Sequence, residues 1–355
     1  MDQGSLALIK QIKLKRKRYI AMGVILILTL IAIAIVSISL GKAEISIKDI
    51  IDIIAGKITA NPELYSHIKA YKVAIVWDIR LPRILIGVIV GTGLAVAGTV
   101  FQSLLMNPLA DPYTIGVSTG AAFGASVIIY INLFISAIQM PITPFAFLGA
   151  FITLLLVLKI ANRGGIINSS NLIIAGIIVS SILSAGISFL KNAAGEQVSA
   201  IIFWLMGSLA SRTWMHVMLA YPIIITAIIV CTYYSDDLNL LCLGEKDARG
   251  LGVDIDKMRK VFLVMGATIT AVCVSVSGII GFIGLIIPHL LRFSVTSDNR
   301  ALIPLSGLLG GVILVLADNI SRVMFATEIP VGVLTTLLGG PFFIYIFIKK
   351  NKQIQ

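Results

Sequence analysis

The chain carries few of the charged residues that a water-facing surface needs. Charged residues make up 13% of the 355 positions, whereas a soluble domain has about 25%. Hydrophobic residues make up 58%, and the mean hydropathy is +1.01. The composition therefore excludes a soluble globular protein and indicates an integral membrane protein. Its apolar runs lack the alternation of period two that a barrel strand would show, so we expect helices, which satisfy their own backbone hydrogen bonds within lipid.

Clusters that would build a metal site, a disulfide or a phosphate loop are also missing. The three cysteines, Cys231, Cys242 and Cys273, are widely spaced, and the three histidines are equally isolated. We interpret the cysteines as small core residues, and we predict no metal site and no catalytic residue. No G-x-x-x-x-G-K-[ST] sequence occurs, so any ATP that drives this protein must bind to another chain.

The net charge of +11 would suit a protein that binds nucleic acid, but a membrane location explains it better. Lysine and arginine collect in the cytoplasmic segments of membrane proteins. Six basic residues precede the apolar run 19–40, and that run of about 21 residues is long enough to span a bilayer. A signal peptide has an apolar stretch of only about 7–15 residues. We therefore predict an uncleaved first helix with its N-terminus inside the cell, and no nucleic-acid partner.

Ten apolar segments are candidates to cross the lipid bilayer as helices, at about 20 residues per crossing. They lie near 19–40, 83–106, 113–133, 142–160, 168–190, 214–233, 259–277, 279–294, 301–321 and 332–348. The predicted fold class is thus an all-α integral membrane protein with about ten transmembrane helices and both termini in the cytoplasm. Most Lys and Arg residues then fall on the cytoplasmic side, as the positive-inside rule requires.

The predicted helices form one domain. We predict a basic cytoplasmic segment at 1–18, a single ten-helix membrane domain at 19–350 and a cytoplasmic tail at 351–355. Within the domain, 41–82 is an extracytoplasmic segment and 234–258 is a cytoplasmic loop. A further apolar segment, 198–210, is too short to span the membrane and is expected to be a re-entrant or surface helix.

The predicted spans contain very few ionisable residues. This scarcity argues against ion-driven transport, because such carriers usually hold charged groups at bilayer depth. Asp318 is expected to pair with Arg322, one helical turn away. Gly87 and Gly91 form a G-x-x-x-G pair, which is typical of closely packed helices, either within the chain or between subunits.

One predicted helix, 168–190, carries a mildly polar stripe. Gly176, Ser180, Ser184 and Ser188 recur every four residues along it. Hydroxyls on such a stripe either bond to backbone carbonyls one turn back or to a neighbouring helix, or they line a wet path for a solute. Both interpretations stay open.

Two arginines on the extracytoplasmic side are exceptions to the positive-inside rule. The sequence WDIRLPR (77–83) places Arg80 and Arg83 immediately before the second helix, on the extracytoplasmic side. Lipid phosphates or an acidic partner protein would each explain positive charge at this place.

A polar stretch, LNLLCLGEKDARGLGVDIDKMRK (238–260), lies between two long apolar runs, and the topology places it in the cytoplasm. Its glycines suit a helix–turn–helix in which Gly252 ends one helix and Asp254 caps the next. It contains no nucleophile–base pair, no metal-ligand cluster and no phosphate loop, so it is not a chemical site.

Six segments, in order and over nearly the full length of the chain, resemble the permease subunits of the binding-protein-dependent ABC importers for iron–siderophore, haem and vitamin B12. The segments are RLPR (80–83), GTVFQSLLMNPLADPYTIGVSTGA (98–121), WLMGSL (204–209), LGEKDARGLGVD (243–254), GFIGLIIPHLLR (281–292) and PVGVLTTLLGGPFF (330–343). The resemblance implies ten helices per subunit, a homodimer or close heterodimer around a central path, two cytoplasmic ATPase subunits and an extracytoplasmic binding protein. ATP and Mg²⁺ would bind to the ATPase subunits, and this chain would hydrolyse nothing.

The resemblance also implies roles for residues that match the family's motifs. Docking of acidic residues of the binding protein is implied for Arg80, Arg83 and Arg322. Contact with the ATPase is implied for the cytoplasmic loop, through Leu243, Gly244, Glu245, Ala248, Leu251 and Gly252. We expect the cargo to be a metal chelate, ferric siderophore first and otherwise haem or cobalamin, carried across the cytoplasmic (inner) membrane of a bacterium or archaeon. The competing hypothesis is an ion- or proton-coupled secondary transporter that works alone.

Overall fold

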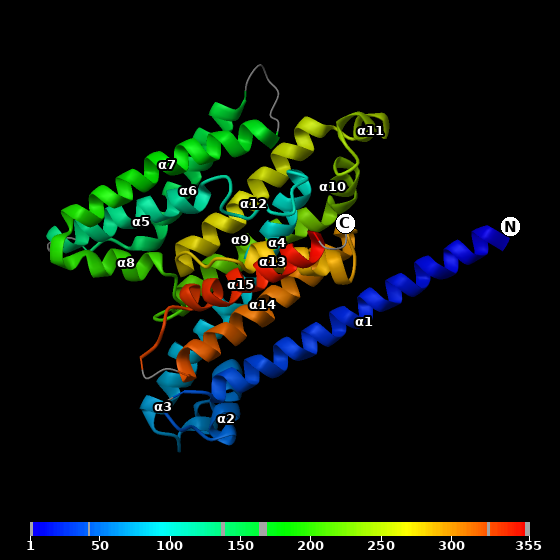
Figure 1. Cartoon of the computed structure of the whole chain (residues 1–355). Coiled ribbons are helices and arrows are strands. Elements are labelled where there is room, and N and C mark those ends of the chain that lie inside the picture. The colour runs from blue at the N-terminus through cyan, green and yellow to red at the C-terminus, as the bar shows by residue number, and fades with distance from the viewer. Residues whose placement is uncertain (1–2, 42, 136–138, 163–168, 325–326, 352–355) are drawn as a thin grey trace.

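A computed structural model describes residues 3–41, 43–135, 139–162, 169–324 and 327–351 (Figure 1). Within these ranges the chain is built from helices and contains no strand, which confirms the predicted all-α class. The predicted C-terminal tail lies, beyond Asn351, outside the described residues.

All ten predicted crossings correspond to helices. They are α1 (Gln3–Ser39), α4 (Leu81–Leu104), α5 (Val117–Phe134), α6 (Ile142–Ala161), α7 (Ser169–Ala193), α9 (Trp214–Tyr233), α12 (Ile255–Ser277), α13 (Ile283–Ser294), α14 (Asn299–Val323) and α15 (Val331–Asn351). Eight of these regions are long and apolar enough to cross a membrane, while α13 and the stretch 331–344 of α15 are shorter apolar helices. The eighth predicted crossing begins later than expected, because the chain stays non-helical from Gly278 to Phe282 before α13 starts.

Shorter helices fill the connections. They are α2 (Ile47–Ile58), a 3₁₀ turn (Pro62–Tyr65), α3 (Ala70–Ala74), a π-helical stretch (Ile75–Arg80), a second 3₁₀ turn (Gly195–Val198), α8 (Ser199–Leu205), α10 (Ser235–Leu241) and α11 (Glu245–Gly250). The short α8 lies within the segment 198–210, for which a non-spanning helix was predicted. The helical content of 41–82 was not predicted. There Ser46 caps the start of α2, because its side chain accepts a hydrogen bond from the backbone N–H of Asp49.

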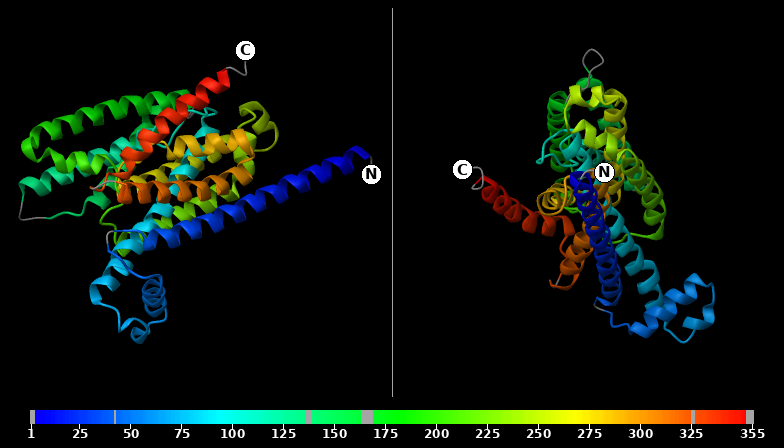
Figure 2. Two further views of the ribbon diagram at one scale, coloured as in Figure 1. Left: turned by 60° about the horizontal axis from the view of Figure 1, so that its bottom comes forward. Right: turned by 90° about the vertical axis from the view of Figure 1, so that its right-hand side faces the viewer.

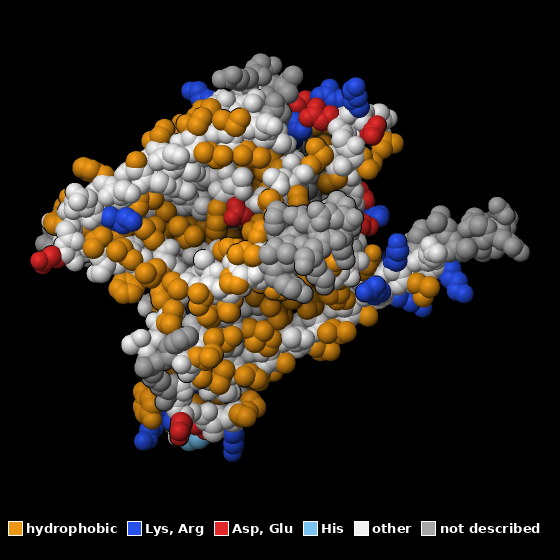
Figure 3. Space-filling model, in the orientation of Figure 1, with side chains coloured by type: hydrophobic (Ala, Val, Ile, Leu, Met, Phe, Trp, Pro, Cys, Tyr) orange, Lys and Arg blue, Asp and Glu red, His pale blue; other side chains and the backbone are white. Residues whose placement is uncertain are grey.

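The two ends of the bundle differ in what they carry. Figures 1 and 2 place the start of α1, the end of α15 and the loop helix α11 toward one end, and α2 and α3 toward the other. In Figure 3 charged side chains gather near α11, along α1 just after its grey tip and around α2, while apolar side chains cover much of the surface between them. This arrangement is what a bilayer around the middle of the bundle requires. It also puts both ends of the described chain on the same side as the loop.

The helix α4 is the centre of the bundle. In its most apolar stretch 83% of the residues are buried within the chain, against 11% for α1, which lies at the periphery. Helices α9, α12, α13 and α14 all pack against α4, and α14 makes its most extensive contact. The position of α4 therefore determines where the residues at both of its ends meet the rest of the protein.

Glycines allow α4 and α14 to touch along their backbones. A Cβ atom on Gly91 would overlap the carbonyl oxygen of Gly310, and a Cβ on Gly310 would overlap that of Gly91. Of the two interpretations of the G-x-x-x-G pair, packing within the chain is the one observed for Gly91. The helices run antiparallel, so pairs of residues face one another on both sides of this contact. Arg83 meets Asp318 near one end, and the Ser103 hydroxyl donates to Asn299 Oδ1 (2.9 Å) at the other.

We predict that Gly91→Ala destabilises the purified protein by about 1–3 kcal/mol, because the added methyl group forces two packed backbones apart. Gly23→Ala is the matched control, since a Cβ on Gly23 of α1 would meet only Leu305 Cδ2 at 3.9 Å. The measurement is thermal unfolding in detergent. Equal melting temperatures for the two variants would contradict the close contact between α4 and α14.

Candidate functional site

The outer ends of α4 and α14 hold a buried cluster of charged side chains. Arg83 donates two parallel hydrogen bonds to Asp318, from Nε to Oδ2 and from Nη2 to Oδ1, each 2.9 Å long. Its third nitrogen, Nη1, donates to Glu328 Oε2 at 3.0 Å. Such bidentate pairs are the strongest that arginine makes with a carboxylate. Asp318 is buried while the Glu328 side chain is 49% exposed, so Arg83 reaches from the core to the surface.

Arg322 joins the same cluster from one turn further along α14. Its Nε lies 3.5 Å from Asp318 Oδ2, which confirms the pairing predicted from the i, i+4 spacing. Its Nη2 donates to Asn319 Oδ1 and to the backbone carbonyl of Ser37 at the end of α1. One carboxylate thus serves two arginines, and α1, α4 and α14 are tied together at this end.

Arg80 has a different environment. Its Nη1 donates to the carbonyl of Ile38 and its Nη2 to the carbonyl of Ala43, both at 2.7 Å. These bonds satisfy carbonyl groups where the chain leaves α1, and the side chain is 4% exposed. Arg80 therefore anchors the start of the outer segment to the base of α4.

The structure brings the three predicted docking arginines together, but it buries all of them. Arg83 is 7% exposed, and so is the side chain of Arg322. Their internal partners, Asp318 and Glu328, are more than 230 residues away in the sequence from Arg83. The sequence predicted that Asp318 pairs with Arg322, but it did not reveal that Asp318 and Glu328 also pair with Arg83.

The predicted cytoplasmic loop folds as α10, α11 and the first turns of α12. Gly252 has a positive φ of 87°, which is the left-handed conformation expected where α11 ends. Asp254 then caps α12, because its side chain accepts a hydrogen bond from the backbone N–H of Lys257 (3.1 Å). The predicted helix–turn–helix is confirmed.

Residues of this loop divide into a base and an exposed face. Ala248 is fully buried, and Glu245 accepts a hydrogen bond of 2.8 Å from Arg259, which is also buried. That hydrogen bond, together with the charge of Arg259, holds the pKa of Glu245 below its usual value, so the carboxylate is ionised at neutral pH. Leu243 and Leu251 point outward and are 60% and 61% exposed. The loop is thus a braced support that presents two leucines to the solvent.

The predicted polar stripe on α7 passes from a packed end to an open end. Gly176 is buried against the backbone of Thr114 and Ile115, where a side chain would not fit. Ser180 is half-buried beside Gly116, whereas Ser184 and Ser188 are exposed. The stripe therefore includes a helix–turn contact at one end and accessible hydroxyls at the other.

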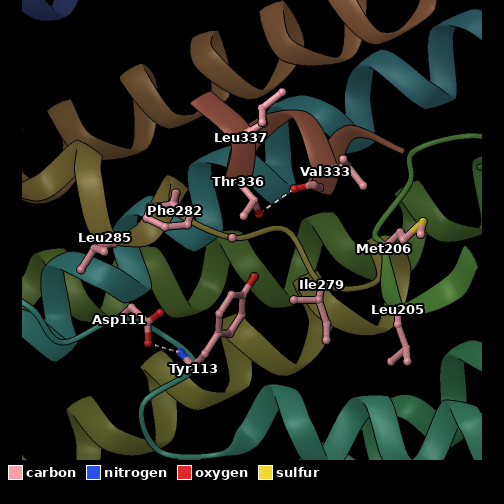
Figure 4. A pocket seen from close by; sticks show the side chains of 12 residues that line it. Asp111, Tyr113, Leu205, Met206, Ile279, Phe282, Leu285, Val333, Thr336 and Leu337 are labelled. Atoms are coloured by element: carbon pink, nitrogen blue, oxygen red, sulfur yellow. Dashed lines mark hydrogen bonds between the residues drawn. The ribbon is translucent and has the colours of Figure 1, made fainter. Parts of the chain in front are cut away.

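A pocket of about 520 Å³ lies beside the break between α12 and α13 (Figure 4). Tyr113 fixes this break, because its hydroxyl donates to the carbonyl of Ile280 and accepts a hydrogen bond from the N–H of Ile280 (3.1 Å). Asp111 in turn accepts from the backbone N–H of Tyr113 (3.0 Å). The rest of the wall is mostly apolar and comprises, among others, Leu205, Met206, Phe282, Val333, Thr336 and Leu337. Nearly all of its lining residues lie in four of the six segments that carry the family resemblance (98–121, 204–209, 281–292 and 330–343), although the sequence did not predict that these segments form a pocket.

Across the described ranges, no group of three or more His, Cys, Asp or Glu side chains is arranged to hold a metal ion. The three cysteines of those ranges are free thiols, with Cys231 and Cys273 buried and Cys242 exposed.

Comparison with known proteins identifies the family. The profile of the FecCD transport family matches residues 27–349. The chain belongs to this family. A cobalamin import system permease of Halobacterium salinarum is 41% identical over 79% of this chain and 74% of its own length. A hemin transport system permease of Yersinia pestis is 37% identical over 78% of this chain and 84% of its own.

A solved structure shares the fold as well. It is described as an inward-facing conformation of a putative metal-chelate type ABC transporter, with a TM-score of 0.79 and 32% identity. The match covers 93% of this chain and 99% of that chain. The chain is therefore a multi-pass membrane protein of the ABC importer permease type, a family in which the ATPase is a separate chain.

We predict that Asp318→Asn destabilises the protein by about 3–5 kcal/mol, because two buried arginines lose their shared negative charge. Asp78→Asn is the control, since Asp78 lies at the same end but is exposed. Thermal unfolding of both purified variants tests this. A melting temperature of Asp318→Asn no lower than that of Asp78→Asn would show that the cluster contributes little to stability.

Proposed function

We propose that this chain is the membrane permease of an ABC importer that moves a metal chelate into the cytoplasm, driven by ATP hydrolysis on a separate subunit. The observation that carries the proposal is the braced cytoplasmic loop with its two exposed leucines, in a chain that has no phosphate loop of its own. Membership of the FecCD family and the likeness to a metal-chelate type transporter support it. Neither gives support to a secondary transporter that works alone.

The proposed assembly contains a second copy of this chain, two ATPase subunits on the cytoplasmic side and a binding protein on the outer side, in the cytoplasmic membrane. The permease would take no cofactor, and ATP with Mg²⁺ would bind to the ATPase subunits. ATP binding would close the ATPase pair, and the cytoplasmic loops would transmit this movement to the helices. Coupling of this kind requires two global states that nucleotide and binding protein favour differently.

The ATPase contact would be made by the exposed side of the loop. Leu243 and Leu251 are apolar, exposed and held on a rigid base, which is the composition of an interface core. Gly244 and Gly252 have open space around them, so a partner backbone can approach closely. Ala248 would support the contact from within the buried base, and the half-exposed Glu245 would support it through its bond to Arg259.

The binding protein would dock on the opposite end, where Arg80, Arg83 and Arg322 converge. A docking carboxylate would approach Arg83 at the position of Glu328, because Glu328 is the half-exposed member of the cluster. We therefore propose that Glu328 occupies Arg83 in the absence of the binding protein and is displaced on docking. Arg80 and Arg322, with their backbone and Asn319 contacts, would hold the docking surface in shape.

The cargo would be a metal chelate, with ferric siderophore, haem and cobalamin as the candidates. Relatives named for cobalamin and for hemin fall within this range. The apolar pocket beside α15 and the exposed hydroxyls of Ser184 and Ser188 would face a large solute with few specific contacts. Gly176 and Ser180 would belong to the packed part of the same path.

We predict that Leu251→Asp abolishes ATP-driven uptake of a ⁵⁵Fe-labelled ferric siderophore and of ⁵⁷Co-cobalamin by proteoliposomes that contain the permease, its ATPase and its binding protein. A charge buried in an apolar contact without a partner weakens association strongly. Leu64→Asp is the control, because Leu64 is an exposed leucine at the outer end.

Wild-type vesicles should accumulate one of the two chelates only when ATP is present. Uptake driven by an ion gradient without the ATPase would refute the importer. Full uptake by Leu251→Asp would leave the importer standing but remove the loop as its ATPase contact.

We predict that Glu328→Gln strengthens docking of the binding protein by about three- to tenfold, because Arg83 no longer has a competing carboxylate. Glu63→Gln is the control, since Glu63 is an exposed acid of the same end. Surface plasmon resonance on the permease in nanodiscs measures the affinity. Weaker docking by Glu328→Gln would mean that Glu328 itself contacts the partner.

A further inference from the structure

A second cavity lies at the outer end, between the turn that joins α8 to α9 and the turn that joins α5 to α6. Its volume is about 480 Å³, within the range of small-molecule sites. Polar side chains line a large part of it, and they come from separate parts of the chain: Asn132, Gln139, Ser208, Ser211, Arg212 and Ser277. The cavity thus combines a size suited to a solute with several hydrogen-bonding side chains, of which Asn132 and Ser277 also bond to backbone groups of the chain.

Arg212 is the charged group of this cavity, and its charge is not balanced. Its Nε donates to the carbonyl of Ala210 at 3.0 Å. No carboxylate of the described residues lies within 4 Å of its guanidinium, unlike those of Arg83 and Arg322, which share Asp318. Its two Nη groups have no hydrogen-bond acceptor in the described part of the chain. Two parallel donors are therefore available in the geometry that binds a carboxylate or phosphate.

Burial and a neighbouring positive charge make the unpaired charge of Arg212 more costly. Burial, and after it the positive charge of Arg83, lower the pKa of Arg212 from its usual value. An arginine nevertheless stays protonated in proteins. A partly buried cation without a counter-charge is costly, and an anion beside it offsets that cost. The field at this cavity favours a negatively charged ligand.

We propose that this cavity binds an anionic group of the transported solute, a carboxylate or an oxyanion, through the two Nη donors of Arg212 and the neighbouring serine and amide groups. This proposal rests on the proposed importer function. It narrows the substrates of the importer to chelates that carry a negatively charged group. The size of the cavity favours a solute over a lipid phosphate alone, because the space exceeds what one headgroup phosphate fills.

The direct test measures anion binding by the permease alone. The purified protein in nanodiscs of phosphatidylcholine is unfolded thermally in sodium citrate and in sodium chloride of equal ionic strength. Citrate should raise the melting temperature of the wild type by several degrees, because a ligand that binds only the folded state stabilises it. Arg212→Gln should lower the apparent citrate affinity by at least about tenfold, and Arg212→Lys should lower it less.

A control variant and a second test variant show whether the citrate response depends on the cavity itself. Lys69→Gln removes an exposed positive charge from the same end and should respond to citrate as the wild type does. Ser211→Asp leaves Arg212 in place but supplies a carboxylate beside it, and Ser211 already has the positive φ of 58° that Asp tolerates. It should abolish the response to citrate. Absence of a citrate effect in the wild type, or an equal effect in Arg212→Gln, would overturn the proposal.

Nanodiscs with phosphatidylglycerol distinguish a solute site from a lipid site. If a lipid phosphate occupies the cavity, phosphatidylglycerol alone will stabilise the wild type more than Arg212→Gln and will remove the effect of citrate, which would overturn the solute assignment. An undiminished citrate effect supports it. The binding measurement needs neither ATP nor the partner subunits, so its failure is distinct from a failure of ATP-driven import.

Discussion

The antiparallel contact between α4 and α14 is the interaction on which the rest of the structure depends. Gly91 and Gly310 remove two side chains where the helices cross, so the backbones meet and the relative position of the helices is fixed. A one-turn shift of either helix would separate Arg83 from Asp318 and leave charged groups without partners in a region of low dielectric. Close packing and charge pairing therefore select the same alignment.

This helix pair also connects the two ends that the proposed function uses. At the cytoplasmic end Ser103 bonds to Asn299, and Arg292 of α13 donates to the Ser103 hydroxyl. Asn239 of α10 accepts a hydrogen bond from the N–H of Asn299, so the loop that would meet the ATPase is attached to the start of α14. At the outer end the same helices carry the arginine cluster. The two ends are thus joined by one closely packed helix pair, along which the proposed coupling would act.

The sequence was sufficient to predict the ten crossing helices, but not the helices within 41–82 or the contacts of the charged residues. The length of an apolar run and the spacing of small residues are local patterns that can be recognised in the sequence. The ten crossings and the turn at Gly252 and Asp254 could therefore be predicted. The burial of Arg83 could not, because its partner Asp318 is distant along the chain and only the fold brings the two together. Arg212 gave no signal in the sequence either, since a single arginine in a short turn is ordinary. Its importance lies in the absence of a nearby carboxylate among the residues that the structure describes.

The pairing of Arg83 with Asp318 has a consequence for how the protein is made. Translation proceeds from the N-terminus, so α4 enters the membrane long before α14 has been synthesised. During that interval the guanidinium of Arg83 has no carboxylate from α14, and its long side chain must extend to the outer headgroups to remain hydrated. The arrival of α14 then draws this charge inward. The paired hydrogen bonds between Arg83 and Asp318 can therefore form only after the ninth crossing has been inserted.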